Sequence, residues 1–205
     1  MTTHQIYDAD AEVHSVAHHL WEVKNCFGEQ TFKELASTHL NHADAWHRHA
    51  DCLEYRLQLT PESPTLKRLQ DMAPKIMPAL EQITGIKLMP AECKMWLDLS
   101  GWHCPYHSDA GLLVVTYQVY LWTHGDVHGT EFTHSTPRTR FDFVPNTGYI
   151  NLNSDLKEHH VDTITGTRLS ACWQFRAKVY VHSFTHRIGC HSMCRSKETS
   201  RLIDH

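Results

Sequence analysis

The stretch PYHSDAGLLVVTYQVYLW, residues 105–122, contains the two features that decide the fold. It begins with a histidine and an aspartate two positions apart, His107 and Asp109, and continues into the most apolar run of the chain, residues 111–122. Residues two apart in an extended segment point the same way, so His107 and Asp109 can converge on one ion. The apolar run is too short to span a bilayer, and it indicates a buried strand.

Strand signatures continue on both sides of this run. From Cys93 to Ser100 the side chains alternate in type, which is the pattern of a strand with two different faces. Turn sequences containing glycine, proline or asparagine separate the later candidates. Further strands are predicted at residues 112–122, 140–144, 148–153 and 168–181.

The first 85 residues have the pattern of helices instead. Apolar residues recur at helical spacing from residue 12 to about 59. The sequence TPESP at 60–64 interrupts this pattern, and Ser63 followed by Pro64 predicts the start of a further helix that ends at Gly85. Two prolines inside that helix predict a kink or a split.

The order of these elements, helices first and then closely spaced strands, predicts an α+β fold. We expect an antiparallel sandwich or barrel packed against N-terminal helices. One domain is predicted over residues 1–205, and it divides into a helical support region at 1–85, a β core at 86–181 and a C-terminal tail at 182–205.

Composition and charge exclude some classes of binding partner and indicate a cellular compartment. The formal net charge is −4, so no global positive field is available to hold nucleic acid or an anionic membrane surface. The N-terminus lacks the basic start and apolar stretch of a secretory signal. Seven cysteines without the spacing of a disulfide framework favour a reducing compartment. The sequence therefore predicts a cytoplasmic protein without membrane contact.

A third metal ligand must come from another strand, and HHVDTITGTR at 159–168 offers two histidines for it. Two histidines and one carboxylate suit a redox-active iron that keeps three positions open for a co-substrate and dioxygen. This segment begins 50 residues after Asp109, and Arg168 stands at the head of the strand that follows. From the residues alone, either His159 or His160 can complete the site.

The chain from about residue 93 to 176 resembles the Fe(II)/2-oxoglutarate-dependent oxygenases, specifically their prolyl-hydroxylase-like branch. Each matching motif is weak by itself, and the ordered set is specific. The motifs are HSD at 107–109, VYLW at 119–122 with GTEF at 129–132 as its partner strand, GYINLNSDLKEHHV at 148–161 and GTRLSACWQF at 166–175. The resemblance implies a double-stranded β-helix, a jelly-roll or cupin-like barrel, for the β core.

The resemblance also implies roles for individual residues. In the family the distal histidine precedes the basic residue by nine or ten positions, which favours His159 over His160 as the third ligand of Fe(II) beside His107 and Asp109. Arg168 would bind the C5 carboxylate of 2-oxoglutarate, since its planar guanidinium suits a carboxylate.

Two further residues of the strand at 112–122 are expected at the co-substrate. Tyr120 matches a family tyrosine whose hydroxyl also holds the C5 carboxylate, and Gln118 shares that strand face. Trp102, Trp122 and Trp173 are candidates for the wall of a substrate pocket, together with Trp96.

The implied activity is hydroxylation of an aliphatic C–H, in a prolyl or other residue of a peptide or in a small molecule. 2-Oxoglutarate and dioxygen would be consumed, and succinate and CO₂ released. Asp109 retains the carboxylate that halogenating relatives lack. Gln174 stands where nucleic-acid demethylating relatives carry a second arginine, which argues against nucleic-acid repair.

Two alternatives remain open. The first is a non-catalytic metal-binding or ligand-binding barrel of the same fold. The second is a zinc-stabilised interaction module built on the C-terminal tail, which carries zinc-type residues without tight CxxC pairs. Those residues are His182, His186, Cys190 and Cys194.

Overall fold

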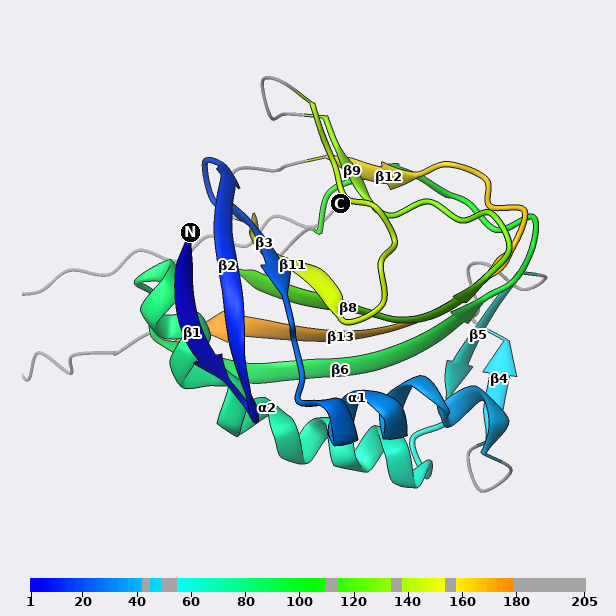
Figure 1. Ribbon diagram of the computed structural model, residues 1–205, viewed down its shortest axis with the longest axis horizontal. Coiled ribbons are helices and arrows are strands. Elements are labelled where there is room, and N and C mark those ends of the chain that lie inside the picture. The colour runs from blue at the N-terminus through cyan, green and yellow to red at the C-terminus, as the bar shows by residue number, and fades with distance from the viewer. Residues whose placement is uncertain (42–44, 49–54, 110–113, 134–137, 154–157, 179–205) are drawn as a thin grey trace, which may run out of the picture.

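Two antiparallel sheets face each other, and two helices cover the outer face of the larger one (Figure 1). The computed structural model describes residues 1–41, 45–48, 55–109, 114–133, 138–153 and 158–178. The predicted tail at 182–205, with its candidate zinc ligands, lies outside the described residues. No helix in the described ranges is long and apolar enough to cross a membrane.

The major sheet has nine strands and the minor sheet has four. The order across the major sheet is β1 (Thr2–Ile6), β2 (Ala9–Ala17), β3 (Leu20–Lys24), β11 (Thr147–Leu152), β8 (Val115–His124), β13 (Thr167–Ala177), β6 (Leu88–Asp98), β5 (Arg56–Leu59) and β4 (Trp46–Arg48). The order across the minor sheet is β10 (Thr139–Arg140), β9 (Glu131–Phe132), β12 (His159–Val161) and β7 (Cys104–His107). This arrangement is a β-sandwich of jelly-roll type, as the alternating segments predicted.

The helices are α1 (Glu29–Ala36) and α2 (Pro64–Thr84), with a short 3₁₀ turn at Thr38–Leu40. As predicted, α2 begins after Ser63, whose side chain accepts a hydrogen bond from the backbone N–H of Leu66, and ends at Gly85 in the left-handed conformation. The split predicted at its prolines is wrong, because α2 continues as one helix through Pro74 and Pro78.

The prediction that residues 12–59 are helical is wrong over most of its length. β2 and β3 occupy the first part of this segment, and β1 precedes them. Within β2 the buried residues Ala11 and Val13 lie two apart, which is the strand period, whereas Val16 is exposed. The turns that join the three strands place Tyr7 and His19 at positive φ without any glycine, so the sequence gives no hairpin signal there.

The β core therefore extends beyond 86–181, because five strands from the first 85 residues join the major sheet. The pairing predicted between VYLW and GTEF is also wrong. β8 lies in the major sheet between β11 and β13, whereas β9 lies in the minor sheet between β10 and β12. Of the strand predicted at 140–144, only Arg140 lies in a strand, as the last residue of β10.

Two of the three hydrophobic clusters in the described residues contain most of the buried apolar side chains. The larger lies between the helices and the major sheet, and it includes Leu69 and Ile76 from α2 with Tyr117 and Trp173 from the sheet. The smaller includes Tyr120, Phe132 and Tyr149 and lies between the two sheets. The residues of β8 and β13 thus divide between a helix-facing side and a side that faces the minor sheet.

β11 approaches β8 closely at Gly148. A Cβ atom at this position would lie 1.9 Å from the carbonyl oxygen of Gln118, which is backbone and cannot move aside. We predict that Gly148→Ala lowers the free energy of unfolding by at least about 2 kcal/mol, because the strands must separate. Denaturant unfolding measures the change.

Gly85→Ala is the matched control, because Gly85 has a positive φ but open space around its Cβ position. Its expected loss is about 1 kcal/mol from backbone strain alone. Equal losses in the two variants would contradict the proposed role of close strand approach.

Candidate active site

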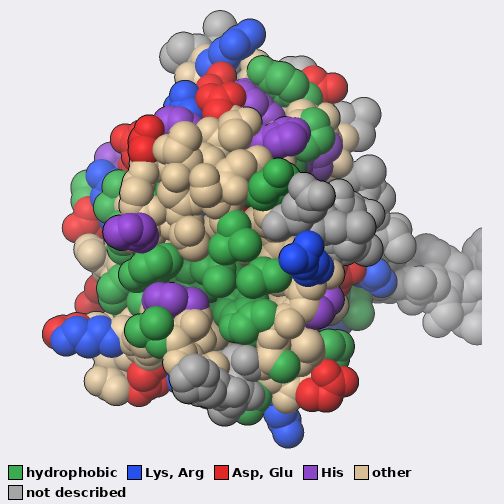
Figure 2. All heavy atoms as spheres, turned by 90° about the vertical axis from the view of Figure 1, so that its right-hand side faces the viewer, with side chains coloured by type: hydrophobic (Ala, Val, Ile, Leu, Met, Phe, Trp, Pro, Cys, Tyr) green, Lys and Arg blue, Asp and Glu red, His purple; other side chains and the backbone are tan. Residues whose placement is uncertain are grey.

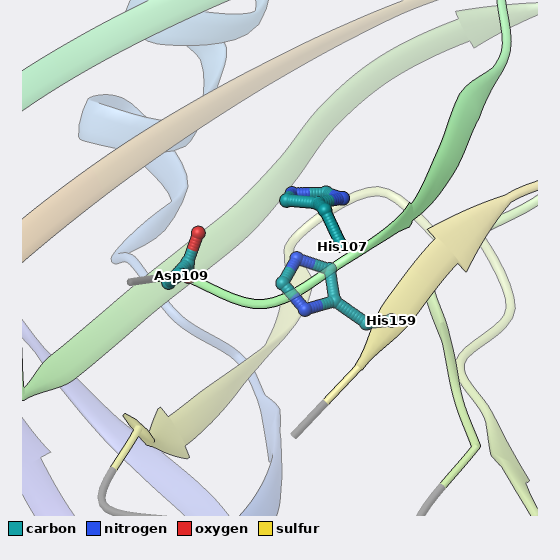
Figure 3. A group of neighbouring side chains, drawn as sticks. All are labelled: His107, Asp109 and His159. Atoms are coloured by element: carbon teal, nitrogen blue, oxygen red, sulfur yellow. The ribbon is translucent and has the colours of Figure 1, made fainter. Parts of the chain in front are cut away.

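The predicted ligands His107, Asp109 and His159 meet at one end of the space between the two sheets. His107 ends β7 and His159 begins β12, and these two residues are direct partners in the antiparallel register. Their ring centroids are 4.2 Å apart. One ligand atom from each of the three residues lies within 4.8 Å of the others, a spacing that could hold a metal ion. Figure 3 shows the two imidazoles side by side with the Asp109 carboxylate next to them.

Hydrogen bonds fix the orientation of the Asp109 carboxylate. Thr116 Oγ1 donates to Asp109 Oδ2 at 3.0 Å, and Asn153 Nδ2 lies 3.5 Å from the same oxygen. Asn153 also donates to Thr116 Oγ1 at 3.1 Å, so the three side chains form one network. Hydrogen bonds of this kind orient metal-binding carboxylates in proteins. Thr116 and Asn153 were not predicted as site residues, although the polar Thr116 within the apolar run was a signal.

His107 is held by its Nδ1 atom, which lies 3.0 Å from the carbonyl oxygen of Pro105. Since a carbonyl only accepts hydrogen bonds, Nδ1 carries the proton and Nε2 keeps a lone pair for a metal in the neutral ring. The Cys104 thiol, 3.5 Å from Nδ1, is the main cause that raises the pKa of His107 to about 9. The Pro105 carbonyl and Asp109 add to this rise, and burial opposes it.

His160 points away from His159, as neighbouring residues of a strand do. Its ring stacks on Tyr106 with 4.1 Å between centroids, and it forms a second possible metal group with Glu131 and Asp162. Arg140 already pairs with Asp162 at 2.9 Å and lies 3.9 Å from Glu131. Arg140 therefore offsets the negative charge of these two carboxylates.

Of the twelve histidines in the described ranges, nine lie outside both groups. Figure 2 shows histidine side chains dispersed over one face of the molecule among other residue types. His103, next to Trp102 and close to the metal group in sequence, is exposed. None of these nine histidines is buried, so in the described part of the chain most histidines are surface residues.

A cavity of about 80 Å³ extends from the metal group between the two sheets. The predicted residues Gln118, Trp102 and Arg168 line it. Its other lining residues, beside the three candidate ligands, are Arg56, Trp96, Cys104, Thr116, Thr130, Tyr149, Val161, Cys172 and Gln174. A candidate metal site and a candidate carboxylate-binding arginine therefore border the same small space.

Arg168 is buried and already paired. Its Nε donates to Asp98 Oδ2 at 2.9 Å, and its Nη1 donates to the carbonyl oxygen of His128. Asp98 is fully buried and also accepts from Arg56, with Nε at 2.6 Å and Nη2 at 3.2 Å. Neither Arg56 nor Asp98 was predicted, because the strand pattern indicated only a polar face and the N-terminal segment was assigned to helices.

Tyr120 lies deeper than expected. Its hydroxyl accepts a hydrogen bond from the backbone N–H of Thr130 at 3.1 Å and is 3.3 Å from Thr130 Oγ1. Burial raises the pKa of the Tyr120 hydroxyl, so it remains protonated at neutral pH. Tyr120 does not itself border the cavity, and it supports Thr130, which does.

Two of the tryptophans proposed for a pocket wall lie elsewhere. Trp173 faces the helices, and its Nε1 donates to the Leu69 carbonyl oxygen of α2 at 2.8 Å. Trp122 packs against the same helix-side core and stacks on His39 with 4.1 Å between centroids. Neither residue lines the cavity, whereas Trp96 and Trp102 do.

Solved structures with the same fold include several 2-oxoglutarate oxygenases. A prolyl-4-hydroxylase from Pseudomonas putida matches with a TM-score of 0.56 at 16% identity, over 78% of this chain and 94% of that one. A Trichoplax adhaerens prolyl hydroxylase, solved with a peptide of hypoxia inducible factor, has a TM-score of 0.58 at 11% identity over 77% and 84% of the two chains. The resemblance to prolyl-hydroxylase-like oxygenases is confirmed at the level of the fold.

A third similar structure binds a different kind of molecule. HygX from Streptomyces hygroscopicus was solved with nickel, 2-oxoglutarate and hygromycin B. It has a TM-score of 0.57 at 8% identity and covers 78% of this chain and 83% of its own. No protein-family model matches the sequence, and no curated protein matches it significantly.

The raised pKa of His107 predicts that metal binding depends on pH. A metal binds the neutral imidazole, so each pH unit below about 9 should weaken the affinity about tenfold through this group. Affinity should therefore rise between pH 7 and 9, with release of one proton per ion at neutral pH. Calorimetric titration with Mn²⁺ in buffers of different ionisation enthalpy measures both quantities.

Cys104→Ala is the matched test of the cause of this shift. Loss of the thiol should lower the pKa of His107, so that the affinity for the metal levels off at a lower pH. An unchanged pH profile in this variant would contradict the effect assigned to Cys104.

Substitution of the two neighbouring histidines should affect metal binding to very different extents. We predict that His159→Ala weakens Mn²⁺ binding by at least about 100-fold, because one of three ligands is lost. His160→Ala, which removes a buried imidazole from the opposite face of the same strand, should change it less than about threefold. Equilibrium dialysis measures both, and a larger effect of His160→Ala would reverse the assignment.

Proposed function

We propose that this protein is an Fe(II)- and 2-oxoglutarate-dependent dioxygenase that hydroxylates an aliphatic C–H bond. The observation that carries the proposal is a cavity with two histidines and a carboxylate at one end and buried arginine along its wall. The similarity to solved oxygenases supports an activity of this class. The β core corresponds, in this proposal, to the double-stranded β-helix of that family.

The donor set fits iron. In the metal-bound state His107, Asp109 and His159 would provide two neutral imidazoles and one carboxylate, and further positions on the ion would remain for a co-substrate and dioxygen. Iron with 2-oxoglutarate and dioxygen supplies the oxidation, and succinate and CO₂ are the co-products. Thr116 and Asn153 hold Asp109 in place through Oδ2, so its other oxygen is available to the metal.

The wall of the cavity fits 2-oxoglutarate. Arg168 provides a positive charge for the C5 carboxylate. Gln118 and Thr130 provide neutral hydrogen-bonding groups on the cavity wall. Tyr120 acts through Thr130 in this arrangement. Trp102 packs under the Arg168 guanidinium, with its ring centroid 4.6 Å from Cζ, and restricts its movement.

The substrate is a peptidyl residue or a small molecule. A similar oxygenase binds a peptide and another binds hygromycin B. A nucleic-acid substrate is disfavoured by the negative net charge. The described cysteines Cys26, Cys93, Cys104 and Cys172 are free thiols, which is in keeping with a cytoplasmic location.

Turnover of the co-substrate tests the proposal directly. Protein loaded with Fe(II) under anaerobic conditions and then exposed to dioxygen should convert 2-oxoglutarate to succinate, measured by NMR. Asp109→Ala should reduce this rate by at least about 100-fold, because the metal loses its anionic ligand. Asp10→Ala, which removes an exposed carboxylate on β2, is the matched control and should leave the rate unchanged.

A protein that binds iron but never consumes 2-oxoglutarate would contradict the proposal. It would favour the alternative, a non-catalytic metal-binding or ligand-binding barrel of the same fold. Because uncoupled turnover can be slow, the assay is repeated with a library of proline-containing peptides to stimulate it.

A further inference from the structure

Two arginines share one buried carboxylate beside the proposed co-substrate. Asp98 ends β6, and the register pairs it with Arg56 on β5 and with Arg168 on β13. Both oxygens of Asp98 accept hydrogen bonds from these guanidinium groups, at 2.6, 2.9 and 3.2 Å. Neighbouring strands on either side of β6 therefore place both arginines at one carboxylate.

Aromatic stacking keeps the two guanidinium groups together. The Cζ atom of Arg56 lies 3.9 Å from the ring centroid of Trp102, and that of Arg168 lies 4.6 Å from it. Arg56 also lies over Trp96, at 4.6 Å. These contacts are favourable for a cation, but they carry no negative charge.

The cluster therefore has one positive charge more than it has negative charge. Asp98 is fully buried and Arg168 nearly so, which makes an unbalanced charge costly in this place. Among the described residues that line the cavity, the remaining acid is Asp109, which belongs to the metal group. An anion bound beside the arginines would remove this imbalance.

The charges of the proposed ligands fit this requirement. Iron is a dication and 2-oxoglutarate is a dianion, and the cavity contributes two arginines and two aspartates. Together these charges cancel. In the proposed function the C1 carboxylate would bind the metal, so the C5 carboxylate would be the anion available to the arginine cluster.

We propose that Arg56 is a second anchor for the distal carboxylate and a determinant of selectivity for dicarboxylic 2-oxo acids. This inference rests on the proposed function. Arg56 lines the cavity and can face the distal carboxylate alongside Arg168. Asp98 is a positioning residue, because it fixes the angle of both guanidinium groups and limits the repulsion between them.

Binding of two 2-oxo acids to the metal-loaded protein tests this role. 2-Oxopentanoate has the same chain length as 2-oxoglutarate but carries a methyl group in place of the distal carboxylate. Wild-type protein loaded with Mn²⁺ is titrated anaerobically with each compound by calorimetry. The ratio of the two dissociation constants reports the contribution of the distal carboxylate alone.

Arg56→Gln should weaken 2-oxoglutarate binding by about 10- to 100-fold, the loss expected for a charged hydrogen-bonding partner. Binding of 2-oxopentanoate should change less than about twofold, so the ratio falls. Arg56→Lys should give an intermediate ratio, because it keeps the charge and loses the planar fork. Arg68→Gln removes a half-exposed arginine that pairs with Glu34 on α1, and it should leave the ratio unchanged.

Two results would overturn the inference while leaving the proposed function in place. One is an Arg56→Gln variant that keeps the wild-type ratio. The other is an equal loss of affinity for both acids with a lowered melting temperature in both Arg56 variants, since this is the behaviour of a purely structural arginine. Wild-type protein that binds Mn²⁺ but neither acid would overturn the proposed function and this inference with it.

Discussion

Burial on both faces of β8 and β13 is the constraint on which the structure depends. The helices cover one face and the minor sheet covers the other, so alternate residues of each strand meet different surroundings. Leu169 and Trp173 face the apolar helix side, whereas Arg168 and Cys172 face the cavity. Arg168 can remain buried because Asp98 on the neighbouring strand β6 and the carbonyl oxygen of His128 accept its hydrogen bonds. The candidate active site thus lies between one face of these strands, whose other face forms the main core, and the minor sheet, which carries His107 and His159.

The meeting of the three candidate metal ligands could be predicted from the sequence because its signals are local. His107 and Asp109 lie two apart before an apolar strand, and His159 stands at a family spacing from Arg168. The structure brings the three candidate ligands together. The strands of the second half of the chain were predictable for a similar reason, since their alternation reflects the two-sided burial directly.

The first half of the chain was less predictable, for a physical reason. Ala11 and Val13 are buried two apart, but the hairpin turns beside β2 lack the glycine or proline that normally reveals them. The sharing of Asp98 by two arginines is also hidden in the sequence, because Arg56 lies 42 residues from Asp98 and Arg168 lies 70. Only the strand order brings these residues together.

Because β13 pairs with a strand on each side, its register decides which of its side chains face the cavity. β13 is hydrogen-bonded to β6 on one side and to β8 on the other along nearly its whole length. A shift of this strand by one residue would turn Arg168 into the apolar layer beneath the helices and expose Trp173 to the cavity. Such a misregistered chain would bury a guanidinium without its carboxylate, so it would be less stable than the correctly aligned one. Replacement of this arginine by an apolar residue would remove the energetic cost of the shifted alignment as well as a binding group.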